Sequence, residues 1–184
     1  IVICAGNHYN ISGNYIDRSG NGGIIVTGRR GDFNGEPYRA FSNTIAITGN
    51  VIFRSGKAPY DEEGSCHMLL KDAIGLSVTG NTMCIGRDDG PHGVYTPDYG
   101  MILENLGSSI VCGNTMACAA FKKLIWDKGG HAPDTIIKDN TGVLAVNDPA
   151  AGAPVESPSY PHTLRISDNP WYRENLKIPY DFPV

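Results

Sequence analysis

Three charged residues end short apolar segments, and their types suit acid–base chemistry. Lys71, Glu104 and Asp127 close the segments HMLLK, GMILE and KLIWD. Side chains of a β-strand alternate between its two faces, so we expect the closing charges and Ile102 to point outward and the core to receive Met101, Leu103, Leu124 and Trp126. If the three segments form adjacent parallel strands ~4.8 Å apart, these charges make one outward column.

In such a column Glu104 and Asp127 would be direct neighbours. Two carboxyl groups this close split their pKa values, so that one of them stays protonated. Glycosidases use such a pair as the acid and the nucleophile or base, and Lys71 beside it would be an electrostatic clamp or the base of a lyase. The alternative is a solvated ladder of alternating charge without chemistry, because structural ion pairs also shift pKa values.

Other side chains near this column are candidates for binding a substrate. His67 and Lys123 begin two of the segments and would form a second outward column, suited to a sugar carboxylate or hydroxyl or else ordinary surface. Asp88, Asp89 and His92 lie in a long loop and could supply an acid, a base or Ca²⁺ ligands. Asp-Asp-Gly is equally an ordinary turn, which we favour. No Ca²⁺-binding motif is recognisable, so we predict no cofactor.

Two arginines form a further candidate site, for an anion. Arg18 and Arg54 each lie four residues after a recurring Asn, so we expect them to stack in adjacent layers. Paired guanidinium groups indicate an anionic ligand or a nearby carboxylate, such as that of Asp17. Residues 30–32 spell the cell-adhesion tripeptide RGD, a match so short that we attribute it to chance.

A recurring motif sets the positions of these residues. It reads apolar, any, apolar, any, Gly or Asp, Asn, and its copies end at Asn14, Asn50, Asn81, Asn114, Asn140 and Asn169. The intervals of 36, 31, 33, 26 and 29 residues indicate a constant core with loops of different length, as in a β-solenoid. Gly-Asn and Asp-Asn tolerate a left-handed corner, and stacked Asn amides can hydrogen-bond along the axis. Lys71 and Glu104 both lie ten residues before their Asn, which predicts a shared register, whereas Asp127 lies 13 before its Asn.

This motif resembles the asparagine ladder of the pectate-lyase-like proteins, over roughly residues 5 to 170. The resemblance implies a right-handed parallel β-helix of about five to six coils, with three short strands in each coil. It also implies a polysaccharide or oligosaccharide partner and a secreted or cell-surface location. The activity stays open between a glycoside hydrolase or polysaccharide lyase and a non-catalytic glycan-binding or structural segment, as in tailspikes and adhesins. The aspartate motifs of pectate lyases and polygalacturonases are not recognisable, so the resemblance identifies a fold more than a mechanism.

The coils are expected over residues 1–146, with a Pro- and Ala-rich loop or linker over 147–163 and a last partial coil and C-terminal cap over 164–184. The chain opens with residues 1–4, IVIC, which look like a strand already under way. A solenoid needs a cap at each end. We therefore expect another copy of the chain, or further coils of a longer chain, to cover this strand.

Charge and apolar content exclude some partners. The chain has 15 Lys and Arg against 19 Asp and Glu, a net charge of −4, which argues against binding nucleic acid. No apolar run approaches the ~18 residues of a membrane span, so we predict no membrane partner. The five cysteines form no CxxC pair, and most are expected to be buried thiols.

Overall fold

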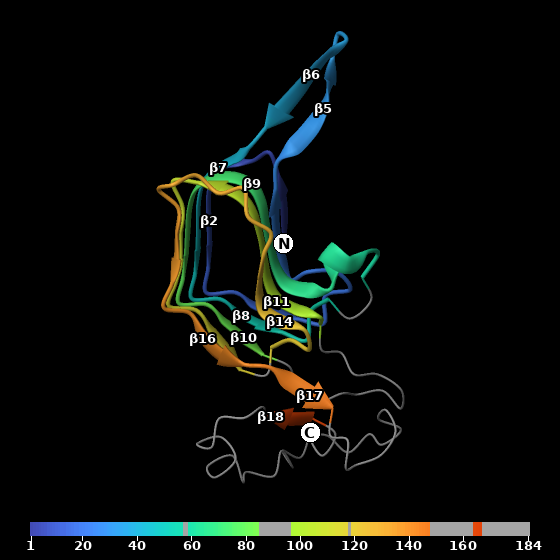
Figure 1. Cartoon of the computed structure of the whole chain (residues 1–184), viewed down its shortest axis with the longest axis vertical. Coiled ribbons are helices and arrows are strands. Elements are labelled where there is room, and N and C mark those ends of the chain that lie inside the picture. The colour runs from blue at the N-terminus through green and yellow to red at the C-terminus, as the bar shows by residue number, and fades with distance from the viewer. Residues whose placement is uncertain (57–58, 85–96, 118, 148–163, 167–184) are drawn as a thin grey trace.

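The computed structural model of the chain is built from β-strands (Figure 1). It describes residues 1–56, 59–84, 97–117, 119–147 and 164–166. The described residues form one short 3₁₀-helix and eighteen strands. The elements are β1 (Val2–Cys4), β2 (Asn7–Ser12), β3 (Tyr15–Asp17), β4 (Ile24–Thr27), β5 (Arg29–Phe33), β6 (Glu36–Ala40), β7 (Ser42–Thr48), β8 (Val51–Phe53), η1 (Glu62–Gly64), β9 (Cys66–Thr79), β10 (Thr82–Cys84), β11 (Tyr99–Gly107), β12 (Ile110–Cys112), β13 (Thr115–Ala117), β14 (Lys123–Asp127), β15 (Ile136–Lys138), β16 (Thr141–Val143), β17 (Ala145–Asn147) and β18 (Leu164–Ile166).

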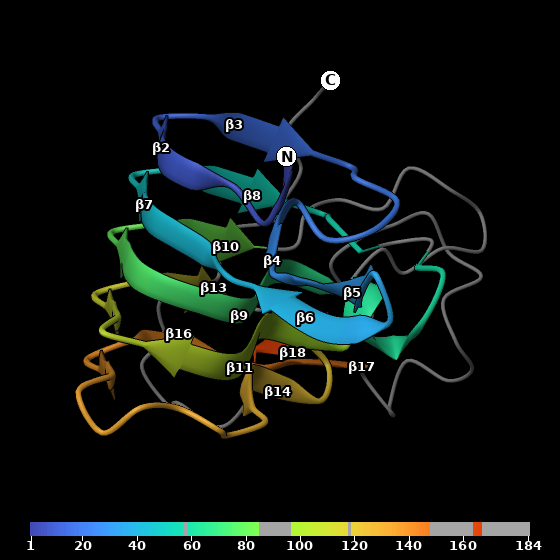
Figure 2. The same cartoon turned by 90° about the horizontal axis from the view of Figure 1, so that it is seen from above.

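Most strands pair in parallel with the strand of the next layer, as the repeat predicts (Figure 2). A nine-stranded sheet contains the order β1-β4-β9-β11-β14, with β2, β7, β12 and β15 joined to it through β9. A second sheet has the order β16-β13-β10-β8-β3. The expected all-β class with parallel sheets is therefore confirmed.

One apolar cluster fills the space between these sheets. Met68 of β9 and Met101 of β11 are Cα partners, and both are fully buried, as is Leu103. From the facing sheet Ile52 and Met83 join the same cluster. The alternation expected for β11 therefore holds on its core side.

Left-handed backbone and asparagine side chains make one corner of every layer. The residue before each Asn has positive φ, at Gly13, Gly49, Gly80, Gly113 and Asp139. From Asn14 onward, each Asn Nδ2 donates to the Oδ1 of the Asn in the next layer, at 2.8–2.9 Å, which joins Asn14, Asn50, Asn81, Asn114 and Asn140 into an asparagine row. The predicted alignment is thus confirmed for these five; Asn169 lies outside the described residues.

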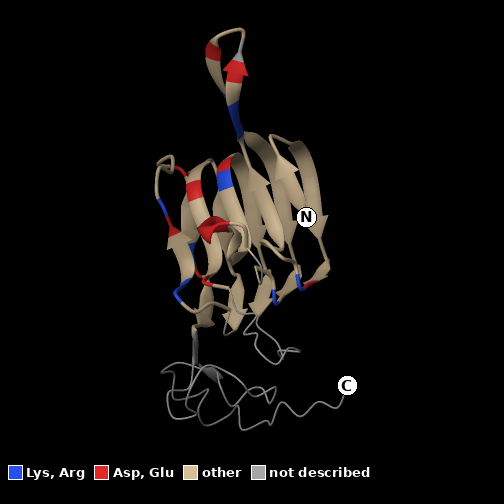
Figure 3. Cartoon of the chain, turned by 90° about the vertical axis from the view of Figure 1, so that its right-hand side faces the viewer, with Lys and Arg blue, Asp and Glu red and all other residues tan. Residues whose placement is uncertain are grey.

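Two pairs of strands are antiparallel instead. β5 and β6 form a hairpin that projects from the body (Figures 1 and 3). β18 pairs antiparallel with β17, so residues 164–166 do not add the parallel layer expected of a last partial coil. The rest of the predicted linker and cap lies outside the described residues.

Candidate functional site

The predicted site lies on the side of β4, β9, β11 and β14 that points away from the core (the outer face). Lys71 of β9 and Glu104 of β11 are Cα partners, as their equal spacing from the asparagine row predicts. Thr27 of β4 is the partner of Lys71 on its other side. These three residues therefore form part of one outward column.

The predicted contact between Glu104 and Asp127 is wrong. Asp127 is the Cα partner of Leu103, one place short of Glu104. Lys128 comes next, and its backbone N–H donates to the Leu103 carbonyl at 2.8 Å. The outward column therefore continues with a cation and not with a second carboxylate.

The register of β14 explains why Asp127 does not lie beside Glu104. Trp126 is the partner of Ile102, and its ring stacks on Tyr99 with 4.4 Å between centroids, so it lies on the outer face and not in the core as expected. Ile125, the partner of Met101, packs against the core instead. A shift of one residue exchanges the two faces of a strand, which moves Ile125 and Trp126 to opposite sides, whereas Leu124 packs against the core as expected.

Four charged side chains on the outer face form a closed set of ion pairs (the ionic ring). The Lys71 ammonium lies 3.0 Å from a carboxylate oxygen of Glu63 and 3.0 Å from one of Glu104. The Lys128 ammonium lies 3.0 Å from the same Glu104 oxygen and also contacts Glu63. All four side chains are 23–28% exposed, so each carboxylate meets two ammonium groups in a partly desolvated setting.

The ionic ring fixes the protonation states of its members. Partial burial on its own raises the pKa of Glu104, but hydrogen bonds and charges from Lys71 and Lys128 bring that pKa below its ordinary value. Burial on its own lowers the pKa of Lys71, and its two carboxylate partners raise it above its ordinary value. At neutral pH the carboxylates are therefore ionised and the amines protonated.

An apolar patch lies beside the ionic ring. Ile102, expected on the surface, does point outward but is fully buried. The η1 segment flanks this patch: the Cys66 thiol donates to the Glu63 carbonyl at 3.1 Å, and the Tyr99 hydroxyl donates to Glu62 Oε1 at 2.7 Å. The patch consists of Cys66, Leu69, Tyr99 and Ile102, with Ile25 and Trp126 packed against it.

His67 was predicted to point outward, and this is wrong. Its side chain is fully buried, and its carbonyl accepts a 2.8 Å hydrogen bond from Gly23. A side chain at Gly23 would come within 2.5 Å of Ile52 and 2.8 Å of Ser55 Oγ, so this row of positions points into the core. Burial lowers the pKa of His67 to about 3, which the neighbouring backbone of Ala119 offsets only in part. His67 is therefore a neutral core residue and not a ligand on the outer face.

Lys123 is exposed, but it does not share a column with His67. Its Cα partner is Tyr99, which in turn pairs with Cys66. The neighbouring Lys122 contacts Asp98 at 2.9 Å. Lys123 therefore lies at the edge of the outer face, on the side of η1.

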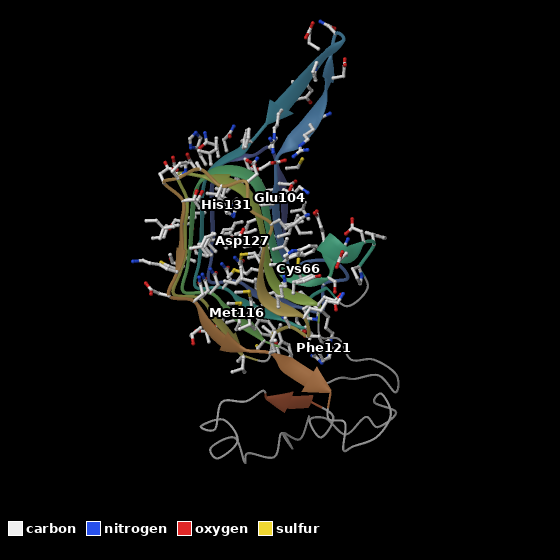
Figure 4. All side chains as sticks on the ribbon, in the orientation of Figure 1. Cys66, Glu104, Met116, Phe121, Asp127 and His131 are labelled. Atoms are coloured by element: carbon white, nitrogen blue, oxygen red, sulfur yellow. The ribbon has the colours of Figure 1, made fainter. Side chains whose placement is uncertain are left out.

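Asp127 has a partner that sequence reasoning missed. Its carboxylate lies 2.8 Å from Nε2 of His131 and accepts the backbone N–H of Gly129 at 2.7 Å. His131 Nδ1 accepts the backbone N–H of Leu106 at 3.1 Å, which requires the proton on Nε2. Both ring nitrogens are occupied, so the pair holds the turn after β14 (Figure 4). The spacing Asp-x-x-x-His after a strand was the available signal.

A second missed residue is Asp72, which ties the β5–β6 hairpin to the body. Its side chain is only 5% exposed and contacts Arg30 at 3.3 Å, and it also pairs with Arg39. Asn105 Nδ2 donates to it at 2.6 Å. Burial alone raises the pKa of Asp72, but these partners bring it below its ordinary value, so the carboxylate is ionised.

Arg18 and Arg54 stack as predicted, away from the outer face. They follow β3 and β8, and Asp17 lies 3.3 Å from Arg54 and 3.9 Å from Arg18. Arg54 is nearly buried and lies over the Phe53 ring at 4.5 Å. Asp17 is thus the carboxylate expected between the two guanidinium groups.

Asp88, Asp89 and His92 lie outside the described residues. Elsewhere in the described chain, no three His, Cys, Asp or Glu side chains gather as metal ligands would. Among the four described cysteines, only Cys66 is fully buried, and burial raises the pKa of its thiol. Cys84 and Cys112 are half-buried and Cys4 is exposed, so the expectation that most thiols are buried is wrong for these four. Within the same residues, no helix has the length and apolar character needed to cross a bilayer.

No protein-family model matches the chain, and no solved structure matches it.

Proposed function

We propose that the chain is a right-handed parallel β-helix of the pectate-lyase-like kind that binds an extended glycan on its outer face without cleaving it. Parallel layers joined by the asparagine row support the fold part of this proposal. The resemblance carried by the recurring Asn motif supports a polysaccharide or oligosaccharide as the ligand. A secreted or cell-surface location would follow from such a ligand.

The ionic ring is the observation that favours binding over catalysis. A general acid must hold a proton near neutral pH, which requires a raised pKa, yet the pKa of Glu104 is lowered. A lysine that acts as a lyase base requires a lowered pKa, yet the pKa of Lys71 is raised. Asp127, the other predicted catalytic residue, pairs with His131. Catalysis by these three residues therefore stays a prediction, and activity measurements test it.

The same ring suits the recognition of sugar hydroxyl groups. Its side chains keep about a quarter of their surface exposed, so hydroxyls can reach charged donors and acceptors. Thr27, Lys71, Glu104 and Lys128 follow one another across four layers, a direction along which an extended chain of sugars could lie. Lys128 ends this column and lies over the ring of Trp126 at 5.1 Å; Trp126 belongs to the neighbouring column, as the partner of Ile102.

A panel of neutral and uronate-containing polysaccharides tests the proposal by calorimetry combined with product analysis. We expect binding without products, and weaker binding for Glu104→Gln and Lys71→Met. Lys138→Met is the matched control, because Lys138 is an exposed lysine of β15, outside the outer face. New reducing ends, or absorbance of unsaturated uronates that disappears in Glu104→Gln, would show an enzyme instead. Absence of binding to every glycan would leave a purely structural module.

A further inference from the structure

The β5–β6 hairpin projects from the body with both faces exposed (Figure 3). Asn34 and Gly35 make its two-residue turn with φ of 56° and 82°, and Asp32 Oδ1 accepts the Gly35 N–H at 2.7 Å. An isolated two-stranded hairpin is marginally stable in water. Its base is held by Asp72, but beyond that base the strands pair only with each other among the described elements.

The two edges of the hairpin differ. Asp32 of β5 pairs with Pro37 of β6. Proline has no N–H to donate to a neighbouring strand, so β6 is blocked as an edge at this point. Opposite residues in an antiparallel ladder alternate between pairs that bond each other and pairs whose backbone groups point outward. A proline fits the second type, so the backbone groups of its partner Asp32 point outward, to the open β5 edge. The pattern repeats every two residues, so the backbone groups of Arg30 point to the same edge.

The side chains of this open edge are complementary to themselves. In an antiparallel pair of two β5 strands centred on Gly31, Arg30 of each strand lies opposite Asp32 of the other. Opposite charges at such positions attract, and like charges repel. Shifting the register by two residues would place Arg30 opposite Arg30, or Asp32 opposite Asp32. Hydrogen bonding allows this register and those shifted by two residues, because outward-pointing backbone groups then lie opposite one another. Charge selects the centred register among them.

Glycine at the centre also suits this pairing. Gly31 is the Cα partner of Tyr38, and a side chain at position 31 would come within 2.7 Å of the Tyr38 ring. Two glycines opposite each other leave room for the two Tyr38 rings, each 37% exposed, to meet across the centre.

We propose that two copies of this chain associate through antiparallel pairing of their β5 strands, giving a four-stranded sheet between the two bodies. Arg30-Gly31-Asp32 is then a self-recognition segment. The partner is a second copy because the same three residues supply both halves of the charge pattern. The paired surface is small, so the association is weak and depends on protein concentration.

Sedimentation velocity over a wide concentration range tests this, with two charge variants measured alone and mixed. Arg30→Glu brings a second carboxylate opposite Asp32, and Asp32→Arg brings a second guanidinium group opposite Arg30. Each variant alone should therefore associate about tenfold more weakly or not at all. In an equimolar mixture opposite charges face each other again, and dimers should return as mixed pairs.

Two controls make the same charge change and should associate like the wild type. Arg29→Glu lies on the same strand but on the other face, and Arg39→Glu removes an arginine that, like Arg30, contacts Asp72, but from β6, away from the open edge. Circular dichroism that matches the wild type would show that each variant keeps its fold. A wild-type chain that stays monomeric at every concentration would overturn the proposal. So would an Arg29→Glu variant as defective as Arg30→Glu, or a mixture that does not recover association.

Discussion

The asparagine row and the outer face are built on the same layers, but they handle polar groups in different ways. Asn50, Asn81 and Asn114 are fully buried, and each makes the same set of hydrogen bonds to the layers on either side. Lys71 and Glu104 on the outer face keep about a quarter of their surface exposed and depend on ionic partners.

The partners of these two regions also come from different parts of the chain. Each Asn is bonded by the equivalent Asn of the next layer, so the repeat supplies its own partners. Glu63 of the ionic ring comes from η1, and Lys128 comes from the turn after β14. The first region is thus a product of the repeat, whereas the second depends on segments outside it. We therefore expect substitutions in the asparagine row to lower the free energy of unfolding more than substitutions in the ionic ring.

Replacing an inner asparagine should have the largest effect. Asn81 Oδ1 accepts from the Asn50 N–H and Nδ2, and Asn81 Nδ2 donates to the Ile47 carbonyl and to Asn114 Oδ1. Asn81→Ala leaves several of these buried groups unpaired, so we expect a loss of about 3–4 kcal/mol in the free energy of unfolding. Urea denaturation measures it.

Asn14→Ala is the control for this prediction, because Asn14 is only half-buried and lies at the edge of the row. We expect it to cost about 1 kcal/mol. Equal losses for the inner and the edge variant would contradict the idea that the buried, repeated bonds dominate.

The two regions also differ in how far the sequence predicted them. One local motif, repeated with the same residue types, places the asparagine row without knowledge of the loops. The segment KLIWD has three consecutive apolar residues, so either face of β14 could point to the core, and the choice depends on Trp126 stacking on Tyr99, a contact between layers. Glu63 lies in a loop whose path no repeat determines, so its pairing with Lys71 and Lys128 could not be predicted.

The anchor of the hairpin should rank second in stability. Asp72→Asn removes a carboxylate that is 5% exposed and leaves two guanidinium groups without it, but these arginines are 61% and 38% exposed and can be hydrated. We therefore expect a loss of about 2–3 kcal/mol. Hydrogen exchange should show faster opening of β5 and β6 in particular. Asp32→Asn, on the exposed hairpin, is the control and should leave stability almost unchanged.

Buried His67 gives the next effect, as a dependence on pH. The pKa of His67 falls from an ordinary 6.5 to about 3 in the fold, so the unfolded chain binds the extra proton first. Stability should then decrease as pH falls below about 6.5, by about 2 kcal/mol at pH 5. Carboxylates with lowered pKa values, such as those of Asp72 and Glu104, change stability only at lower pH, where the unfolded chain takes up protons at carboxyl groups with ordinary pKa values of 3.8 and 4.5. Unfolding curves of wild type and His67→Phe between pH 7.5 and pH 5 measure the difference, and parallel pH profiles would show that His67 is not responsible.

Glu104→Gln should have the smallest effect and sets the contrast with the asparagine row. Removing this charge breaks two ion pairs of the ionic ring, but water reaches about a quarter of each side chain involved. Partly exposed ion pairs contribute little, so we expect a loss of about 0.5–1 kcal/mol in low salt. Salt screens such pairs, so the difference from wild type should shrink further at 1 M NaCl. The deficit of Asn81→Ala comes from unpaired hydrogen-bonding groups and should persist in salt. Denaturation of both variants at the two salt concentrations provides the measurement. A Glu104→Gln deficit as large and as salt-independent as that of Asn81→Ala would mean that the outer face, like the corner, is part of the structural framework.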